Sequence, residues 1–228
     1  TMDELITGFV GLDAHAESTA IGFAEAGRAP PRFIGTVGAK RSELMKALGR
    51  LGEPGSLLVV YEAGPCGYGL ARELGALGYR CEVVAPSKIP KKAGERIKTD
   101  RRDAMMLARL SRSGDLTAVR VPGAADEAVR DLVRARDDAV RECRNARHRL
   151  KALLLRNGIT YAGKSAWTAA HLRWLATLKM NHPTQQVGFQ EYLHSITESG
   201  ARIARLEQAL RDQLPAWHLR AHVQALMA

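Results

Sequence analysis

The apolar residues of "SLLVVYEAG" (residues 56–64) follow one another without a break, and this pattern is the strongest indication of the fold class. A strand with one wet face alternates apolar and polar residues, whereas a continuous run is typical of a strand covered on both faces. The stretch "RCEVVAP" (80–86) is a second such run, and "GYGLARELGALG" (67–78) between them has helical spacing and ends in glycine. The sequence therefore predicts a sheet whose buried strands lie between helices.

The residues before this stretch predict three more strands and another helix. "FVGLDAH" (9–15) and "STAIGFAEAG" (18–27) are typical of two short strands joined by a tight turn, and "PRFIGTV" (31–37) of a third. "KRSELMKALGRL" (40–51) places its apolar residues at helical period. Strands that first pair as a meander and then alternate with helices predict an α/β fold with a mixed sheet flanked by helices.

A strongly basic segment follows the last of these strands. Residues 88–112 contain nine Lys/Arg against three acids, and they run from a loop into a helix for which Thr99 is a natural N-cap. "SGDLTAVRVPGAADE" (113–127) is typical of a linker with a short extended piece. We therefore expect two domains, residues 1–122 and 123–228.

The second domain is expected to be helical. Apolar residues recur at helical spacing from Asp126, which can cap the first helix, to Asn157, and again from about Gln185 to Leu214, where Pro215 ends the pattern. Two long amphipathic helices predict a helical hairpin or a coiled coil. The apolar faces can pack within one chain or against a second copy, and we expect a homo-oligomer assembled through this region.

Composition and charge narrow the function classes. The net charge of +10 and pI near 9.9 indicate an anionic partner, first nucleic acid and second an anionic membrane surface. No stretch approaches 18 apolar residues, so a membrane-spanning protein is not expected. The three cysteines have no CxxC spacing, which indicates neither a zinc site nor a disulfide framework, and a reducing cytoplasm is the expected setting.

Four acids fall where a metal site can form. Asp13 and Glu62 each end a predicted strand, and Asp100 and Asp103 open the predicted helix at i, i+3 spacing. Such a cluster is unfavourable alone, since unit charges ~4 Å apart repel by roughly 4 kcal/mol at an effective dielectric near 20. Divalent cations reverse that sign, and oxygen ligands suit Mg²⁺ or Mn²⁺. Each acid also has a plainer interpretation as a turn, cap or helix-dipole residue.

Basic residues near this cluster, and on the first long helix, are candidates for phosphate contacts. Those near the acids are Lys88, Lys91, Lys92, Arg96, Lys98, Arg101 and Arg102. In "RECRNARHRLKALLLR" (141–156) we single out Arg144, Arg147 and Lys151, although this segment can also be the solvated face of a coiled coil. Trp167 and Trp174 fall on one helix face and are expected to be core anchors rather than base-stacking platforms. His15 can touch metal or phosphate, but we expect a turn residue.

Long motifs carry a resemblance to a known family. "GLDAH", "YEAGPCGYGLAR", "VVAPSKIPKKAGERIKTDRRDA", "LARLSRSGDLTAV" and "FQEYL" resemble the DEDD-type insertion-sequence transposases, bacterial recombinases guided by a bridge RNA. The resemblance implies an RNase H-like fold of the RuvC type for the first domain. It also implies that Asp13, Glu62, Asp100 and Asp103 are catalytic residues that bind Mg²⁺ (or Mn²⁺) during DNA cleavage and exchange. DNA and guide RNA are then the partners, and the bacterial nucleoid the location.

One departure from the family pattern concerns the end of the chain. The family's C-terminal domain carries a serine nucleophile, and no matching motif precedes the terminal "VQALMA". The chain by itself is therefore expected to be inactive, as a nucleic-acid-binding assembly module. A structure-selective endonuclease of the Holliday-junction resolvase type is a further alternative. An actin-like phosphotransferase is disfavoured because a second glycine-rich phosphate turn is missing.

Overall fold

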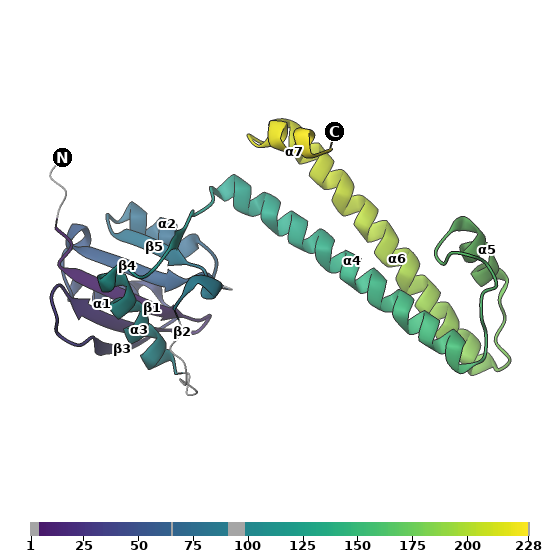
Figure 1. Ribbon diagram of the computed structural model, residues 1–228, viewed down its shortest axis with the longest axis horizontal. Helices are drawn as coiled ribbons and strands as arrows, with labels where there is room; N and C mark the ends of the chain where they lie inside the picture. The colour runs from purple at the N-terminus through teal and green to yellow at the C-terminus, as the bar shows by residue number, and fades with distance from the viewer. Residues whose placement is uncertain (1–4, 65, 91–98, 228) are drawn as a thin grey trace. The chain divides into compact units, whose positions relative to one another are not determined.

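The computed structural model describes residues 5–64, 66–90 and 99–227. The chain forms two compact units, residues 1–122 and 123–228, each of which is described by itself (Figure 1). In the described residues no helix combines the length and the apolar character that a bilayer crossing requires.

The first unit is built on a six-stranded mixed sheet, which confirms the predicted fold class. The spatial order is β3-β2-β1-β4-β5-β6, in which β1, β4 and β5 run parallel and the other pairs are antiparallel. The strands are β1 (Gly8–Ala14), β2 (Ser18–Glu25), β3 (Arg32–Gly38), β4 (Leu57–Glu62), β5 (Arg80–Val84) and the two-residue β6 (Ala118–Val119).

Helices cover both faces of this sheet, which is why the central strands are apolar without alternation. Helices α1 (Arg41–Gly49) and α2 (Gly69–Ala76) pack against Val59 and Tyr61 of β4. Helix α3 (Asp100–Ser113) packs against Val60 on the opposite face. Short 3₁₀ turns, η1 (Pro54–Ser56) and η2 (Pro86–Lys88), lead into β4 and out of β5. Successive residues of β4 therefore enter two different cores.

Two glycines let α3 lie directly on the sheet. Gly11 of β1 and Gly22 of β2 are paired in the ladder. A Cβ atom added at Gly11 would lie 2.2 Å from the carbonyl oxygen of Ala104, and one added at Gly22 would lie 2.4 Å from the same oxygen. Any side chain at either position would therefore force the helix away from the strands.

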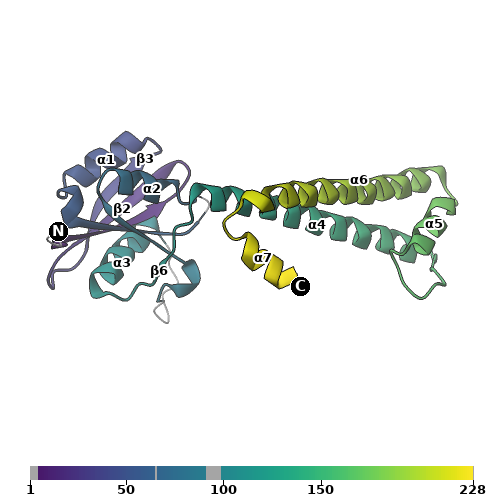
Figure 2. The ribbon, with the colours of Figure 1, turned by 90° about the horizontal axis from the view of Figure 1, so that it is seen from above.

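The second unit is a helical hairpin. Helices α4 (Ala124–Arg156) and α6 (Pro183–Gln213) lie side by side and run in opposite directions, and the short α5 (Ala169–Thr177) lies at the turn between them (Figure 2). Near this turn the two long helices share an apolar core whose buried members are Cys143, Ala146, Leu150, Leu154, Leu175, Met180, Phe189 and Ile196. The predicted hairpin thus packs its apolar faces within one chain.

Toward the other end of the hairpin, polar contacts join the helices. The guanidinium of Arg136 lies 2.8 Å from Oε1 of Glu207, and Arg202 donates to Glu142 at 2.9 Å. The prediction that Asp126 caps α4 is wrong: Gly123 is the N-cap residue. Asp126 instead accepts a hydrogen bond from Nε1 of Trp217 at 2.8 Å. Trp217 lies between the 3₁₀ turn η3 (Leu214–Ala216) and helix α7 (Arg220–Met227).

Candidate metal centre

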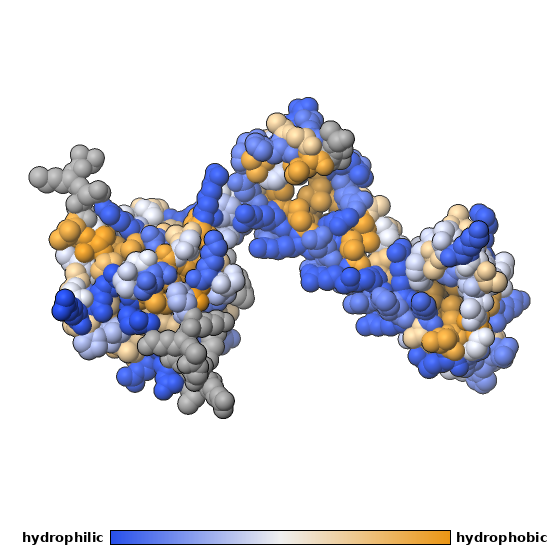
Figure 3. All heavy atoms as spheres, in the orientation of Figure 1, coloured by the Kyte–Doolittle hydropathy of each residue, from blue (hydrophilic) through white to orange (hydrophobic). Residues whose placement is uncertain are grey.

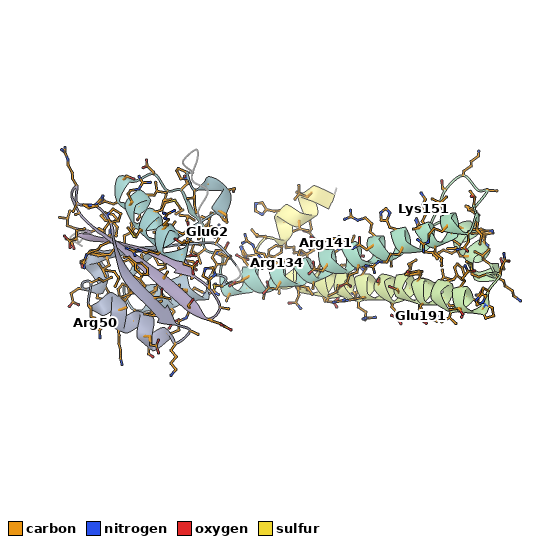
Figure 4. The ribbon with its side chains drawn as sticks, turned by 90° about the horizontal axis from the view of Figure 1, so that it is seen from below. Arg50, Glu62, Arg134, Arg141, Lys151 and Glu191 are labelled. Atoms are coloured by element: carbon orange, nitrogen blue, oxygen red, sulfur yellow. The ribbon has the colours of Figure 1, made fainter. Side chains whose placement is uncertain are left out.

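Asp13 and Glu62 lie next to each other at one edge of the sheet. The parallel pairing of β1 with β4 matches Leu12 to Tyr61, and the two acids follow one residue later on their strands. Because side chains alternate along a strand, Asp13 shares the face of Gly11 and Glu62 the face of Val60. Both of these faces are covered by α3. The two carboxylates therefore leave adjacent strands on the α3 side, and Figure 4 labels Glu62 at this strand end.

Helix α3 brings Asp100 to the same edge, and the first turn of this helix also carries Asp103. Its backbone at Ala104 lies on Gly11, and its first turn lies beside the carboxyl end of β1, so the helix runs antiparallel to that strand. Thr99 is its N-cap, as predicted, with Oγ1 accepting a hydrogen bond from the backbone N–H of Arg102 at 3.3 Å. Asp100 and Asp103 occupy this first turn, where the helix dipole favours negative charge.

Asp100 and Asp103 differ in burial. Asp103 shares one helix stripe with Leu107 and Leu110, which pack against Val60 of β4. Its Oδ2 atom is buried, whereas the side chain of Asp100 is 61% exposed. Asp103 therefore faces the sheet near the end of β4, whereas Asp100 lies on the solvent-exposed side of the cluster.

His15 joins Asp13 to Asp100. Its Nε2 atom lies 3.4 Å from Oδ2 of Asp13 and 3.8 Å from Oδ1 of Asp100. The backbone N–H of His15 donates to the carbonyl of Ser18 at 2.8 Å, which places the residue in the turn between β1 and β2, as expected. The sequence interpretation missed the ring's contact with both carboxylates. The signal was its position two residues after an acid that ends a strand.

The donor atoms are close enough to share one cation. One ligand atom each from Asp13, His15 and Asp100 lies within 4.8 Å of the other two. Ligands around Mg²⁺ stand at about 2.1 Å, so trans partners are separated by about 4.2 Å and small movements would close the set. Carboxylates suit Mg²⁺ and Mn²⁺, whereas imidazole suits softer metals. Asp13 and Asp100 therefore fit the expected ion, and His15 fits the role of a residue that orients them. Glu62 and Asp103 do not belong to this group of close donor atoms.

The loop beneath Glu62 is fixed by the residue before it. Tyr61 points to the opposite face of the sheet, where its hydroxyl donates to the carbonyl of Gly67 at 2.9 Å. Burial raises the pKa of Tyr61 to about 12, so the phenol stays a neutral donor at every physiological pH. Gly67 has φ of 63°, a conformation that favours glycine. The loop also carries Cys66, whose thiol donates to the carbonyl of Ala14 at 3.3 Å.

A cavity of about 570 Å³ opens beside His15. Its lining includes Thr19 and Cys66 and two cations that begin helix α1, Lys40 and Arg41. Arg41 also lies 3.3 Å from Glu73 of α2. These two cations could not be predicted from the sequence, because no local pattern connects the start of α1 with the end of β1.

The predicted phosphate-contacting residues fall into three groups. Lys88, Arg101 and Arg102 are exposed, and the guanidinium of Arg101 lies 5.3 Å from the centroid of the Phe33 ring. Arg144, Arg147 and Lys151 are exposed on α4, in the other unit. The residues outside the described part of the chain are Lys91, Lys92, Arg96 and Lys98.

Comparison with known proteins bears on this arrangement. A family model described as a transposase, of the DEDD IS110 type, matches residues 10–157, from β1 to the end of α4. The chain is 42% identical over 222 residues to the putative transposase y4qE of Sinorhizobium fredii (strain NBRC 101917 / NGR234), covering 96% of this chain and 54% of that protein.

A second relative is the transposase for insertion sequence element IS1533 of Leptospira borgpetersenii. It is 32% identical over 207 residues, which is 90% of this chain and 60% of that protein. The chain thus spans little more than half the length of these curated relatives. With the family model covering β1, β4 and the start of α3, the chain belongs to the IS110-type DEDD transposase family.

Proposed function

We propose that this chain supplies the metal-binding half of a DNA transposase that cleaves and exchanges DNA strands. Asp13, Glu62, Asp100 and Asp103 would hold Mg²⁺ or Mn²⁺. The observation that carries this proposal is the convergence of β1, β4 and the start of α3 on one edge of the sheet, where His15 lies within 4 Å of both Asp13 and Asp100.

The bound metal would stabilise the attacking and leaving oxygens of a phosphodiester during an in-line displacement. The chain's own residues have separate roles around it. His15 would hold the Asp13 and Asp100 carboxylates in position, and Gly11 would keep α3 close enough for its acids to reach the strand ends. Lys88, Arg101 and Arg102, which are exposed, would receive the phosphates. We propose the same role for Lys91, Lys92, Arg96 and Lys98, which lie between them in sequence and outside the described residues.

These cations support affinity for nucleic acid rather than sequence choice, since phosphate contacts carry no base information. We propose that sequence choice comes from pairing between a bridge RNA and DNA, as in other guided systems. Arg144, Arg147 and Lys151 of the hairpin would then contact nucleic acid, and the hairpin would also join copies of the chain. Such an enzyme would act in the bacterial cytoplasm, at the nucleoid.

A structure-selective endonuclease is the second candidate. Its support is that all four acids and His15 come from the first unit, so a metal could bind there without residues of the hairpin. A third candidate is a nucleic-acid-binding assembly module. It differs from the transposase and from the endonuclease because this chain alone would not cleave DNA strands.

Glu62→Gln tests the metal assignment. Removal of this carboxylate should weaken Mn²⁺ binding by more than about tenfold, because loss of even an outer partner of a metal site costs about 10–100-fold. Glu53→Gln is the matched control, since Glu53 is exposed and precedes the same strand. Isothermal titration measures both variants. Equal affinities in the two variants would contradict the assignment.

Cleavage assays separate the candidate functions. Branched DNA and Mg²⁺ are added to this chain and to one extended to the length of its relatives. Cutting by this chain alone would support the endonuclease, and strand joining confined to the longer chain would support the transposase. Loss of either activity in Glu62→Gln, with Glu53→Gln active, would tie the reaction to the metal centre.

A further inference from the structure

The charge of the second unit is concentrated at one end of the hairpin. Residues 143–190, which we call the basic tip, contain eight Lys/Arg and no Asp or Glu. The remainder of the unit, 123–142 and 191–228, contains eight Lys/Arg and ten acids. The eight cations of the tip are Arg144, Arg147, Arg149, Lys151, Arg156, Lys164, Arg173 and Lys179. The tip is therefore the surface of this unit that attracts anions.

An aromatic pocket of about 260 Å³ lies within the basic tip. Four rings line it, those of Tyr161, Trp167, His171 and Trp174. The Tyr161 ring lies 4.7 Å from that of His171 and 5.1 Å from that of Trp174, measured between centroids. Trp167 and Trp174 also border the core of the hairpin, as predicted, and their rings line this cavity. The prediction that they share one helix face is wrong, because Trp167 precedes Thr168, the N-cap of α5.

The backbone at this pocket is held in an unusual conformation. Trp167 has φ of 66°, the one positive value among the described residues other than glycine. Its N–H donates to Nδ1 of the buried His171 at 3.1 Å, and Thr168 caps α5 by accepting from the N–H of His171. Residues held in such conformations cluster at binding sites, where the surrounding structure maintains the strain.

Cationic and apolar side chains border the pocket. The guanidinium of Arg147 lies 5.0 Å from the Trp167 ring centroid, and Lys151 and Leu155 are part of the lining. Leu155 is 72% exposed although it is a large apolar residue. Figure 3 shows apolar atoms exposed among hydrophilic ones at this end of the hairpin, and Figure 4 places Lys151 on the same end of α4.

We propose that this pocket receives an unpaired base of a single-stranded nucleic acid whose phosphates lie on the basic tip. Aromatic faces combined with cations are the composition that binds single strands, because every base has a face to stack and every nucleotide a charge to neutralise. The pocket is smaller than the roughly 300–1,000 Å³ of drug-sized sites, which suits one flat ring system. A stacked duplex offers no base that could enter it.

Charge argues against a second copy of the tip as the occupant. With eight cations and no acid in 143–190, two tips would repel each other. The inference extends the nucleic-acid role proposed for Arg147 and Lys151, but it does not depend on the metal centre.

The test uses the full chain carrying Trp217→Phe, in EDTA, so that the remaining tryptophans, Trp167 and Trp174, report on the pocket. Ligands are twelve-nucleotide uridine and thymidine strands, an abasic strand of equal length, and a duplex. Strands with bases should quench the fluorescence and bind on the order of tenfold more tightly than the abasic strand. Either sugar supports the pocket, and the ratio of the two affinities identifies RNA or DNA as its source.

A matched pair of variants locates the effect. Leu155→Glu places a negative charge at the pocket, and Leu226→Glu makes the same change on α7 at a leucine that is 89% exposed. Leu155→Glu should weaken binding of the base-bearing strands by about tenfold or more and remove their advantage over the abasic strand. Leu226→Glu should change affinity less than about twofold. Because both leucines are exposed, neither change disturbs a core.

Three results would overturn the inference: equal binding of abasic and base-bearing strands, equal quenching by the duplex, or equal effects of the two leucine variants. Each would mean that the tip binds phosphates without taking a base. Since the assay contains no divalent metal, these failures leave the metal centre untouched. Loss of Mn²⁺ binding specific to Glu62→Gln would, in turn, say nothing against the pocket.

Discussion

Gly11→Ala tests the link between packing and the candidate metal centre. The new Cβ would lie 2.2 Å from the carbonyl oxygen of Ala104 and 2.5 Å from the amide nitrogen of Ala108, whereas ordinary contacts begin at 3.4 Å. Both obstructing atoms belong to a helix backbone and cannot rotate away. Helix α3 must therefore shift by about 1 Å, carrying Asp100 and Asp103 with it.

The expected loss in the free energy of unfolding follows from overpacking. Inserting an extra carbon into a packed interface costs about 1–3 kcal/mol, and this case belongs at the upper end because backbone must move. The lower chain entropy of alanine in the unfolded state returns about 0.4–1 kcal/mol. The net loss is about 2 kcal/mol, which lowers the melting temperature of a unit of this size by roughly 8 °C.

Circular dichroism melting and Mn²⁺ titration measure the two consequences separately. Metal affinity should fall by more than about tenfold, because binding constellations tolerate displacements of only about 0.5 Å. Gly75→Ala in α2 is the control, since no atom beyond its chain neighbours and the backbone of its own helix lies within 4 Å of the added Cβ. It should raise the free energy of unfolding by about 0.5–1 kcal/mol. A Gly11→Ala protein that melts within about 2 °C of the parent would refute the packing argument.

Two further predictions concern the cap of α3 and the buried histidine. Thr99→Ala should lower the free energy of unfolding by about 1 kcal/mol, because the hydrogen bond to the N–H of Arg102 is lost. Thr99→Ser should keep most of this stability, and thermal melting measures both variants. Burial lowers the pKa of His171, so the unfolded chain binds its proton more readily. The stability of the hairpin tip should therefore be fully present above about pH 6.5 and should fall as the pH drops through the folded-state pKa of His171. Amide hydrogen exchange around Trp167 measures this stability. The variant His171→Gln should remove the pH dependence.

Local patterns in the sequence were sufficient to predict the main strands and helices of the first unit, its mixed sheet and the two long helices of the second unit, but not α7. The unbroken apolar run of β4 required cover on both faces, and α1 and α2 on one side and α3 on the other provide it. The N-cap of α3 at Thr99 was likewise readable, because capping depends only on neighbouring residues. The cap of α4 could not be predicted in this way, because Asp126 accepts a hydrogen bond from Trp217, which is 91 residues away in sequence.

The candidate site was visible in part. Chain position identified Asp13, Glu62, Asp100 and Asp103 as acids at element ends, but the direction of each side chain depends on the strand register and on the contact of α3 with Gly11. Cations around the site, such as Lys40, come from elements with no local tie to these acids.

Residues close together along the chain therefore account for the helical and strand periodicity, the buried strands, the N-cap of α3 and the basic charge. Which of these features come into contact depends on how the chain packs in three dimensions. The contacts of His15 with two carboxylates, and the position of the Arg147 guanidinium over the Trp167 ring, join residues through space. The physical reason is that such contacts are fixed by packing distances of a few ångströms, on which periodicity along the chain carries no information.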